Sequence, residues 1–162
     1  MTIILGIDPG SRITGFGVIK TQGSTHQYIT SGNIKTSGET AGDRCYQIFA
    51  GITEIVKTYQ PDEVGIEEVF VRHNPKSALK LGQARGAAMV AVAAFDIMLA
   101  EYAPRKIKQT VVGYGAADKA QVQHMIKILL NLSDLPQVDA ADALAVAMCH
   151  ASHRLLNSRL AT

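Results

Sequence analysis

The sequence predicts an α/β fold in which a mixed five-stranded sheet carries helices on both faces. Three observations predict it: β-branched runs fill the first 36 residues, apolar residues recur every 3.6 positions further on, and helices separate the later strands. The chain has 162 residues, 47% hydrophobic and 19% charged, which suits a single folded domain over residues 1–162. Strands joined through a helix are expected to be parallel, so the sheet should be mixed.

The chain opens with a β-hairpin and a third strand. Ile3–Ile7 is an apolar run that ends in Asp8, a Pro-Gly pair turns the chain, and Thr14–Lys20 runs back. His26–Thr36 is predicted to complete a meander. Asp8 has two interpretations. It opens the turn, as Asp before Pro-Gly does well, or it performs chemistry, because a short buried strand seldom holds an unpaired acid.

The middle of the chain alternates between helix and strand. Apolar residues on one 3.6-period face predict a helix over Asp43–Tyr59, which a proline ends. Glu63–Phe70 is predicted to be a strand parallel to the first one, because a crossover leads to it. A long helix rich in Ala and Gly is expected over Ser77–Met98. Gly82 and Gly86 leave one stripe of it flat, either for packing on the sheet or for a helix–helix dimer seam.

The last third is mainly helical. Leu99–Ala103 is predicted to be a short edge strand, and Pro104–Val112 a short helix. Asp118 is expected to cap a helix that runs to Leu132. A final helix is predicted over Val138–Leu155. Together with the earlier elements, this order gives the mixed sheet covered on both faces.

Charge is distributed unevenly along a chain whose net charge is only +2. The segment from Arg72 to Lys127 holds nine Lys and Arg residues against three acids, a net charge of +6. The rest holds seven basic residues against eleven acids, a net charge of −4. This pattern indicates one surface for a polyanion and another for cations, with ordinary solvated helix faces as the alternative.

The composition predicts a protein of the reducing cytosol. Cys45 and Cys149 lie far apart and form no CxxC pair, which argues against a zinc site and against a disulfide framework. No basic region precedes the first apolar run, so no signal peptide is expected. The longest apolar run, Gly86–Phe95, is far shorter than the roughly 20 residues that cross a bilayer.

The acids predict a metal site. Asp8 ends the first strand, Glu67 and Glu68 lie near the end of the fourth, and Asp139 and Asp142 share one face at the start of the last helix. If the first and fourth strands are parallel neighbours, their acids emerge at the same sheet edge. Clustered carboxylates suit Mg²⁺ or Mn²⁺, and two such ions serve phosphoryl displacement. The alternative for the helix acids is that they complement the helix dipole.

Six segments, taken in order, resemble the RuvC-type Holliday-junction resolvases: GIDPGSRITGFGV, IEEVF, SALKLGQARG, IKQTVVG, DKAQVQHM and DAADALAVA. The match spans nearly the whole chain. The resemblance implies a ribonuclease-H-like fold and a homodimer that cuts four-way junction DNA in recombination and repair. It also implies Mg²⁺, replaceable by Mn²⁺, with two ions per active site, a bacterial cytoplasmic location, and a RuvA/RuvB branch-migration complex as partner.

The family's motifs imply four catalytic and metal-binding carboxylates: Asp8, Glu67, Asp139 and Asp142. The resemblance favours Glu67 over Glu68, which strand alternation alone does not, since the two point in opposite directions. Lys119 in DKAQ is expected to lie beside the scissile phosphate, where it offsets developing charge. Its alternative is a solvated lysine in the first turn of a helix.

The remaining candidate residues belong to the DNA surface. Phe70 is expected to stack on bases or wedge between them, with core filling as the alternative. His73, His124 and His150 lack metal-ligand spacing and are expected to be surface or core residues. The basic residues expected to contact phosphates are Arg72, Lys76, Lys80, Arg85, Lys108 and Lys119.

Two other functions are considered. The hairpin GIDPGSRITGFG also resembles the phosphate loop of actin-like ATPases and sugar kinases, but those need a second related lobe, for which 162 residues leave no room. A non-catalytic junction-binding or RNA-processing relative is expected to lack part of the acid set, whereas every acid position is filled here.

Overall fold

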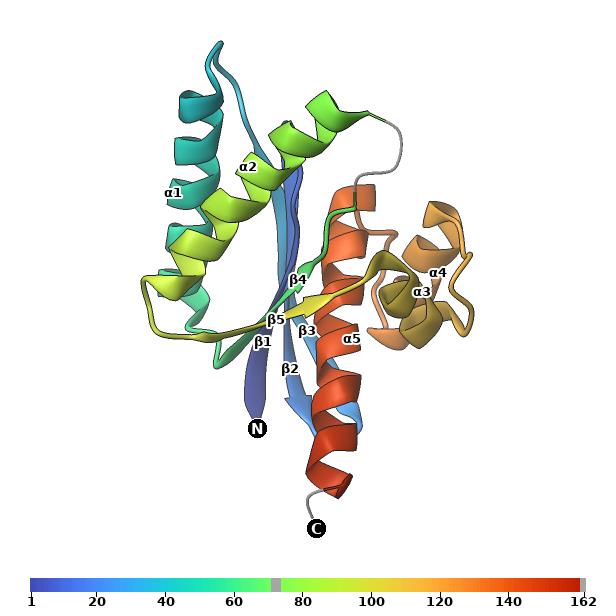
Figure 1. Ribbon diagram of the computed structural model, residues 1–162. Helices are drawn as coiled ribbons and strands as arrows, with labels where there is room; N and C mark the ends of the chain where they lie inside the picture. The colour runs from blue at the N-terminus through green and yellow to red at the C-terminus, as the bar shows by residue number, and fades with distance from the viewer. Residues whose placement is uncertain (71–73, 161–162) are drawn as a thin grey trace.

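The computed structural model of the chain describes residues 1–70 and 74–160. In this part of the chain there are five strands and five helices, with three strands in succession at the start and three helices in succession at the end (Figure 1). The strands are β1 (Thr2–Asp8), β2 (Ile13–Gln22), β3 (Thr25–Lys35), β4 (Glu63–Glu67) and β5 (Met98–Tyr102). The helices are α1 (Ala41–Tyr59), α2 (Pro75–Ala93), α3 (Pro104–Val112), α4 (Lys119–Leu129) and α5 (Val138–Leu160).

The strands form one mixed sheet in the order β3-β2-β1-β4-β5. β1, β2 and β3 are an antiparallel meander, while β4 is parallel to β1 and β5 is parallel to β4. In the register, Asp8 pairs with Gly15 on β2, and Ile7 pairs with Ile66 on β4. The predicted mixed five-stranded sheet is therefore confirmed, and the carboxyl ends of β1 and β4 meet at one edge.

Helices cover both faces of the sheet, as predicted. α1 and α2 lie on one face, α5 lies on the other, and α3 and α4 pack against α5 (Figure 1). The alternation of side chains along β1 explains the two cores: Leu5 and Ile7 join the cluster under α1 and α2, while Ile4 joins the cluster around α5. Residues at even positions of β1, Asp8 among them, consequently face α5.

α5 approaches the sheet unusually closely because both surfaces are built from small residues. A Cβ added to Gly6 would collide with the carbonyl oxygen of Ala143 and lie 2.6 Å from the amide nitrogen of Ala147. A Cβ on Gly17 would lie 2.7 Å from the side chain of Leu144. Only glycine fits at these positions, so the strand glycines determine how near the helix lies to the acids of the sheet.

β4 is shorter than the predicted strand Glu63–Phe70. It ends at Glu67, where its neighbours also end, because β1 stops at Asp8 and β5 stops at Tyr102. The amide of Glu68 still donates to the carbonyl of Tyr102 over 2.9 Å. Beyond that bond no neighbouring strand remains to extend the ladder.

α2 also differs from its prediction. It begins at Pro75, since Asn74 caps it through the amides of Lys76 and Ser77, and it ends at Ala93, before Asp96 takes a positive φ of 56° and turns the chain into β5. A Cβ on Gly82 or Gly86 would meet nothing within 4 Å. The interpretation that this stripe packs on the sheet is therefore wrong: α2 contacts its neighbours through alanines and Val92 instead.

The other helix ends differ from expectation by a few residues. α1 begins at Ala41 because Thr40 forms a capping box with Asp43. α4 has the predicted Asp118 cap but ends at Leu129. α5 continues past the expected Leu155 to Leu160. Among the described helices, none is long and apolar enough to cross a membrane.

Candidate active site

Two acids from neighbouring parallel strands stand side by side at the carboxyl edge of the sheet. Asp8 ends β1 and Glu67 ends β4. Glu67 lies two residues after Gly65, and a Cβ added to Gly65 would point toward Val146 and His150 of α5. Side chains two residues apart on a strand lie on the same face. The structure thus puts Glu67 on the same face as Asp8, which strand alternation alone had left open between Glu67 and Glu68.

α5 brings its first turn to the same edge. A Cβ added to Gly15, the register partner of Asp8, would lie 2.6 Å from the carbonyl carbon of Asp139. The backbone of Asp139 therefore rests on β2 beside Asp8, and Asp142 follows one helical turn later. The predicted convergence of acids from β1, β4 and α5 is present in the geometry.

Asp8, Glu67 and Asp142 surround a small hollow of about 140 Å³ together with two lysines. Apolar side chains of α3, α4 and α5 close its walls. Asp139 is not in its lining, although its charge reaches Asp8. The lining residues are Asp8, Glu67, Pro104, Ile107, Lys108, Lys119, Val122, Asp142 and Ala145.

The acids destabilise one another's charge. Burial, followed by the charges of Glu67 and Asp142, raises the pKa of Asp8 from 3.8 to about 8, although Lys119 lowers it. Burial and then the charge of Asp142 raise the pKa of Glu67 from 4.5 to about 7, against the lowering effect of Lys119 and Lys108. Burial also raises the pKa of Asp142. The cluster therefore holds more negative charge than its surroundings neutralise.

Lys119 is the cation that partly offsets this charge. It is the first residue of α4, and its Nζ lies 3.0 Å from Oδ2 of Asp142. Burial lowers the pKa of Lys119, but the hydrogen bond and charge of Asp142 outweigh it, so the pKa rises and the ammonium form is secured. Its side chain is still 64% exposed and accessible to a ligand entering the hollow.

The donor set fits a hard divalent cation. Among residues 1–70 and 74–160, no three carboxylate, imidazole or thiol side chains are drawn together tightly enough to enclose an ion. The described lining of the hollow nevertheless holds three carboxylates and neither histidine nor cysteine. Oxygen ligands of this kind, whose mutual repulsion raises their pKa values, favour Mg²⁺ or Mn²⁺.

The chain matches one family of known proteins over most of its length. The family model of "Crossover junction endodeoxyribonuclease RuvC" matches residues 4–150. The chain belongs to the RuvC family. The protein of that name from Tolumonas auensis is 61% identical over 150 residues, which cover 93% of this chain and 87% of that protein. The one from Photobacterium profundum is 60% identical over 157 residues, which cover 96% of this chain and 91% of that protein.

A solved structure supports the same conclusion about the fold. T. thermophilus RuvC in complex with a Holliday junction substrate superposes with a TM-score of 0.90 and 32% identity, and 97% of each chain is covered. The yeast mitochondrial Holliday junction resolvase Ydc2 superposes with a TM-score of 0.68 over 96% of this chain and 82% of that one, at 12% identity, and shares the fold. The ribonuclease-H-like architecture expected for a RuvC family member is confirmed.

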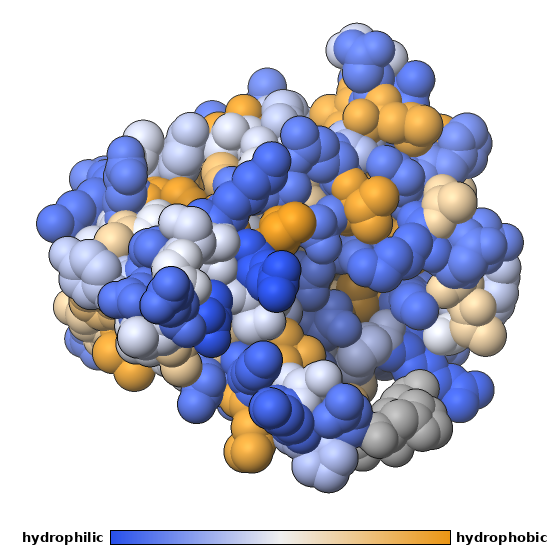
Figure 2. Space-filling model, turned by 90° about the horizontal axis from the view of Figure 1, so that it is seen from above, coloured by the Kyte–Doolittle hydropathy of each residue, from blue (hydrophilic) through white to orange (hydrophobic). Residues whose placement is uncertain are grey.

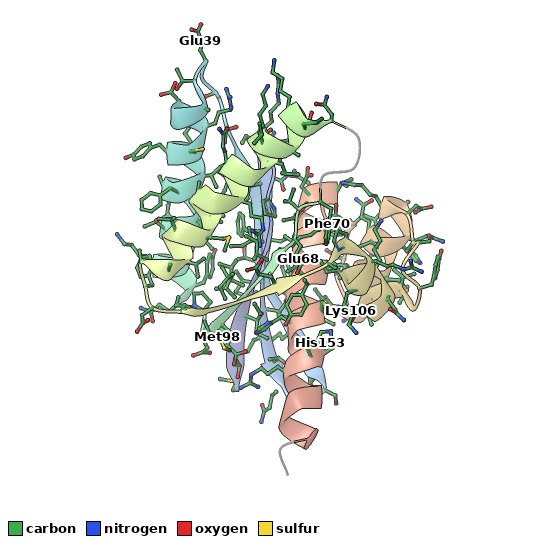
Figure 3. All side chains as sticks on the ribbon, viewed as in Figure 1. Glu39, Glu68, Phe70, Met98, Lys106 and His153 are labelled. Carbon is green, nitrogen blue, oxygen red and sulfur yellow. The ribbon has the colours of Figure 1, made fainter. Side chains whose placement is uncertain are left out.

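A second, larger hollow of about 550 Å³ adjoins the acid site of this RuvC family member, and the two share Glu67, Pro104 and Lys108. Phe70 lines it and is 55% exposed, so the core-filling interpretation of Phe70 is wrong. Figure 3 labels Phe70 and Glu68 where the chain leaves β4 toward α3 and α5. Arg105 also lines this hollow.

Sequence reasoning missed Arg105 as a site residue. It was one of nine basic residues in the positive segment but belonged to none of the family-like motifs. In the structure its side chain lies over Gly115, where an added Cβ would lie 2.9 Å from Nε of Arg105. Its place in the positive segment was the signal in the sequence that could have found it.

The other predicted DNA contacts are spread more widely. Arg85 contacts Glu101 and donates from Nε to the carbonyl of Glu67 over 3.2 Å, so it braces the end of β4. Lys80 lines a separate hollow of about 390 Å³ with Arg12 and Arg44. Lys76 is exposed in the first turn of α2. Arg72, another predicted DNA contact, and His73, expected to be a surface or core residue, lie outside the described residues.

Proposed function

We propose that this RuvC family member is a structure-selective endonuclease that resolves Holliday junctions by nicking two opposing DNA strands in recombination and repair. The observation that carries the proposal is the convergence of Asp8, Glu67 and Asp142 from three elements around one hollow, with Lys119 among them. The family membership supplies the reaction class, phosphodiester hydrolysis in DNA.

In this mechanism Asp8, Glu67, Asp139 and Asp142 would hold the metal ions, two Mg²⁺ or Mn²⁺ per site. When bound, the ions would supply positive charge for the reacting phosphate and would make water acidic enough to serve as nucleophile near neutral pH. The ends of β1 and β4 and the first turns of α5 hold the carboxylates in place. The apolar walls contributed by Ile107, Val122 and Ala145 limit the water that reaches the hollow.

Lys119 and Lys108 act on the phosphate. Lys119 is exposed enough to meet a phosphate oxygen and close enough to Asp142 to remain aligned, so it offsets the charge that develops as the bond to the leaving oxygen breaks. Lys108 lines both hollows and is suited to the neighbouring phosphate. Phe70 and Arg105 line the adjoining hollow, where Phe70 stacks against an unpaired base.

The surface at this end suits DNA. Figure 2 views the molecule from the end at which β1 finishes, and hydrophilic side chains dominate it, with separate small apolar spots. The basic candidates Lys76 and Lys80 start α2 near this end, and the hollow of Arg12, Arg44 and Lys80 adds positive charge. Phosphate contacts of this kind give affinity without sequence discrimination.

The exposed stripe of α2 supports a homodimer. Leu79 and Val90 are 69% and 60% exposed, and Gly82 and Gly86 lie between them on the helix with open space at both Cα atoms. Two such stripes can approach closely, and a two-fold dimer matches the symmetry of a four-way junction. Gly86→Trp is expected to yield monomers in analytical ultracentrifugation, whereas Ala120→Trp, on the exposed start of α4, should leave dimers.

Partners and location follow from the family. Junction DNA is the substrate, a RuvA/RuvB branch-migration complex supplies the junction, and the bacterial cytoplasm is the compartment. The bacterial relatives support this assignment, as do two cysteines that are both unpaired.

The decisive experiment compares cleavage of a synthetic four-way junction, a linear duplex and RNA in Mg²⁺. Wild-type protein should nick the junction in paired strands and leave the other two substrates intact. Asp8→Asn should abolish cleavage and leave junction binding within about threefold, while Glu54→Gln, an exposed acid on α1, should behave as wild type. Mg²⁺-dependent nicking by Asp8→Asn would refute the assignment.

Salt dependence tests the DNA surface separately. With several phosphate contacts, junction affinity should fall by about a hundredfold or more between about 50 and about 200 mM salt. Filter binding or anisotropy at constant Mg²⁺ measures it. A flat response would show that the basic residues around Lys80 and Lys108 do not carry the binding.

A further inference from the structure

A buried hydrogen-bonded chain joins β4, β5 and α5 away from the acid site. His150 on α5 is 4% exposed, and both of its ring nitrogens have partners. Nε2 lies 2.7 Å from Oε2 of Glu63, the first residue of β4, and Nδ1 lies 2.9 Å from the hydroxyl of Tyr102, the last residue of β5. Arg154 donates from Nε to the second oxygen of Glu63 over 2.6 Å. Such a satisfied network specifies one geometry in a core.

The protonation states within this chain are consistent with one another. Burial alone would raise the pKa of Glu63, but hydrogen bonds from Arg154 and His150 outweigh it and keep that pKa below its usual range, so Glu63 is ionised. Burial raises the pKa of Tyr102 to about 12, so its hydroxyl keeps its proton and is able both to donate and to accept at Nδ1 of His150. An imidazole proton on Nε2 directed at Glu63, with Nδ1 accepting from Tyr102, is a tautomer that satisfies every member.

Aromatic contacts hold the chain from the side. The ring of His153 stacks on Tyr102 with centroids 5.4 Å apart and an interplanar angle of 20°, while the ring of His150 meets Tyr102 edge-on at 5.8 Å. Figure 3 labels His153 on α5 and Lys106 on α3. Tyr102 is thus fixed by contacts with two consecutive turns of α5 and not by a single hydrogen bond.

The network connects the two elements that carry the acids. Tyr102 is the register partner of Glu67, and Glu63 lies at the other end of the same strand as Glu67. His150 lies eight residues after Asp142 on α5, about 12 Å along the helix axis. Any sliding of α5 along β4 would stretch the bonds of His150 and change the separation of Asp142 from Glu67 by the same amount.

The network adds directional contacts to an interface that is otherwise apolar. α5 meets the sheet through alanines and strand glycines, with Leu144 packed against Gly17 and Val146 against Gly65 as larger side chains. Gly65 leaves room for the network, because a Cβ there would lie 3.3 Å from Cβ of His150 and 3.5 Å from Cε2 of Tyr102.

We propose that His150 is a positioning residue: by binding Glu63 and Tyr102 it fixes the axial position of α5 on β4, and with it the spacing of the site acids. The proposal rests on the proposed nuclease function for its effect on catalysis. Its effect on the carboxylate cluster does not depend on that function, since cation binding by the cluster can be measured without DNA.

Two substitutions of His150 test it. His150→Leu introduces an apolar side chain of similar bulk and removes both hydrogen bonds. His150→Gln introduces an amide that can donate to Glu63 and accept from Tyr102. For His150→Leu we expect kcat on the junction to fall about tenfold or more with KM unchanged, and Mn²⁺ affinity, measured by electron paramagnetic resonance without DNA, to weaken about tenfold. His150→Gln should restore both to within about threefold of wild type.

A matched control separates positioning from general stability. Ile52→Val removes one buried methylene from α1, on the opposite face of the sheet, and should lower Tm without changing kcat or Mn²⁺ affinity. If His150→Leu behaves in the same way as this control, the positioning role is refuted.

A His150→Leu variant that does not fold and a wild-type protein that does not cut the junction each leave a measurement that decides the role of His150. If His150→Leu does not fold, Tyr102→Phe, which removes only one hydroxyl, is measured in its place; a twofold to fivefold loss of kcat or Mn²⁺ affinity supports the proposal and unchanged values overturn it. If wild-type protein does not cut the junction, the proposed function fails, while the Mn²⁺ affinities of the variants still decide the role of His150.

Discussion

Asp8→Asn is expected to stabilise the metal-free protein at pH 8 while it abolishes cleavage. Burial and the neighbouring acids raise the pKa of Asp8 from 3.8 to about 8, so ionising it costs free energy in the folded protein that the unfolded chain does not bear. A rise of about 4 pH units corresponds to about 5.5 kcal/mol at about 1.36 kcal/mol per unit. Repulsion within the cluster raises the pKa of both Asp8 and Glu67, so assigning all of it to Asp8 overstates the gain. We therefore expect Asp8→Asn to raise the free energy of unfolding by about 2 kcal/mol.

The sign of the shift fixes the pH dependence. A carboxyl whose pKa is higher in the folded than in the unfolded protein binds protons more tightly when folded, so the wild type loses stability as pH rises from about 4 to about 8. Asparagine does not titrate. The advantage of Asp8→Asn should therefore be small near pH 4, grow through neutral pH, and be largest at pH 8 and above.

Thermal unfolding in EDTA measures this directly. About 2 kcal/mol corresponds to an increase in Tm of about 4–8 °C for a chain of this size. Added Mg²⁺ should raise the Tm of wild type more than that of the variant, because ligand binding stabilises the folded state in proportion to its affinity. Glu54→Gln is the control and should not shift Tm. A variant Tm at or below wild type at pH 8, or a difference that does not vary with pH, would refute the electrostatic reasoning.

Two further predictions concern the cation and the close helix. Lys119→Ala should slow junction cleavage about a hundredfold in single-turnover assays, because the phosphate loses its charged donor. Junction affinity should stay within about threefold. An unchanged rate would show that Lys119 is a solvated lysine in the first turn of a helix. Gly6→Ala should lower the free energy of unfolding in urea by about 3 kcal/mol, because its Cβ collides with the backbone of α5. Gly42→Ala, at the start of α1, is its control, because the added Cβ would meet only the hydroxyl of Thr40, at an ordinary contact distance of 3.7 Å. Equal stabilities of the two variants would contradict the close approach.

The architecture was predictable wherever periodicity carried the signal. The meander, the amphipathic α1 and the crossover into a strand parallel to β1 follow from alternation and spacing, and those predictions are confirmed. Element ends were less predictable because they depend on partners: β4 stops at Glu67 where β1 and β5 stop, which no property of residues 68–70 reveals.

The site was predictable in its acids and less so in its supports. Asp8 stood out because a charge at the end of an apolar strand is costly, and the family resemblance favoured Glu67 over Glu68; the structure brings both together with Asp142. The charge of Arg85 predicts a phosphate contact, but its contacts with Glu101 and with the backbone carbonyl of Glu67 were not predictable from the sequence. His150 carried no signal, since its partners Glu63 and Tyr102 are 87 and 48 residues away in sequence.

The glycines of the first hairpin acquire a structural reason from the position of α5. On β1 and β2, Gly6, Gly15 and Gly17 face this helix, while the apolar residues between them face α1 and α2. The same stretch therefore allows a close helix on one face of the sheet and fills an apolar core on the other. Removing side chains lets the helix bring its acids to Asp8, while Leu144 and Val146 pack against Gly17 and Gly65. A site that needs its carboxylates placed to within a fraction of an ångström gains from a directional restraint elsewhere on the same helix, and hydrogen bonds supply direction where apolar contact does not.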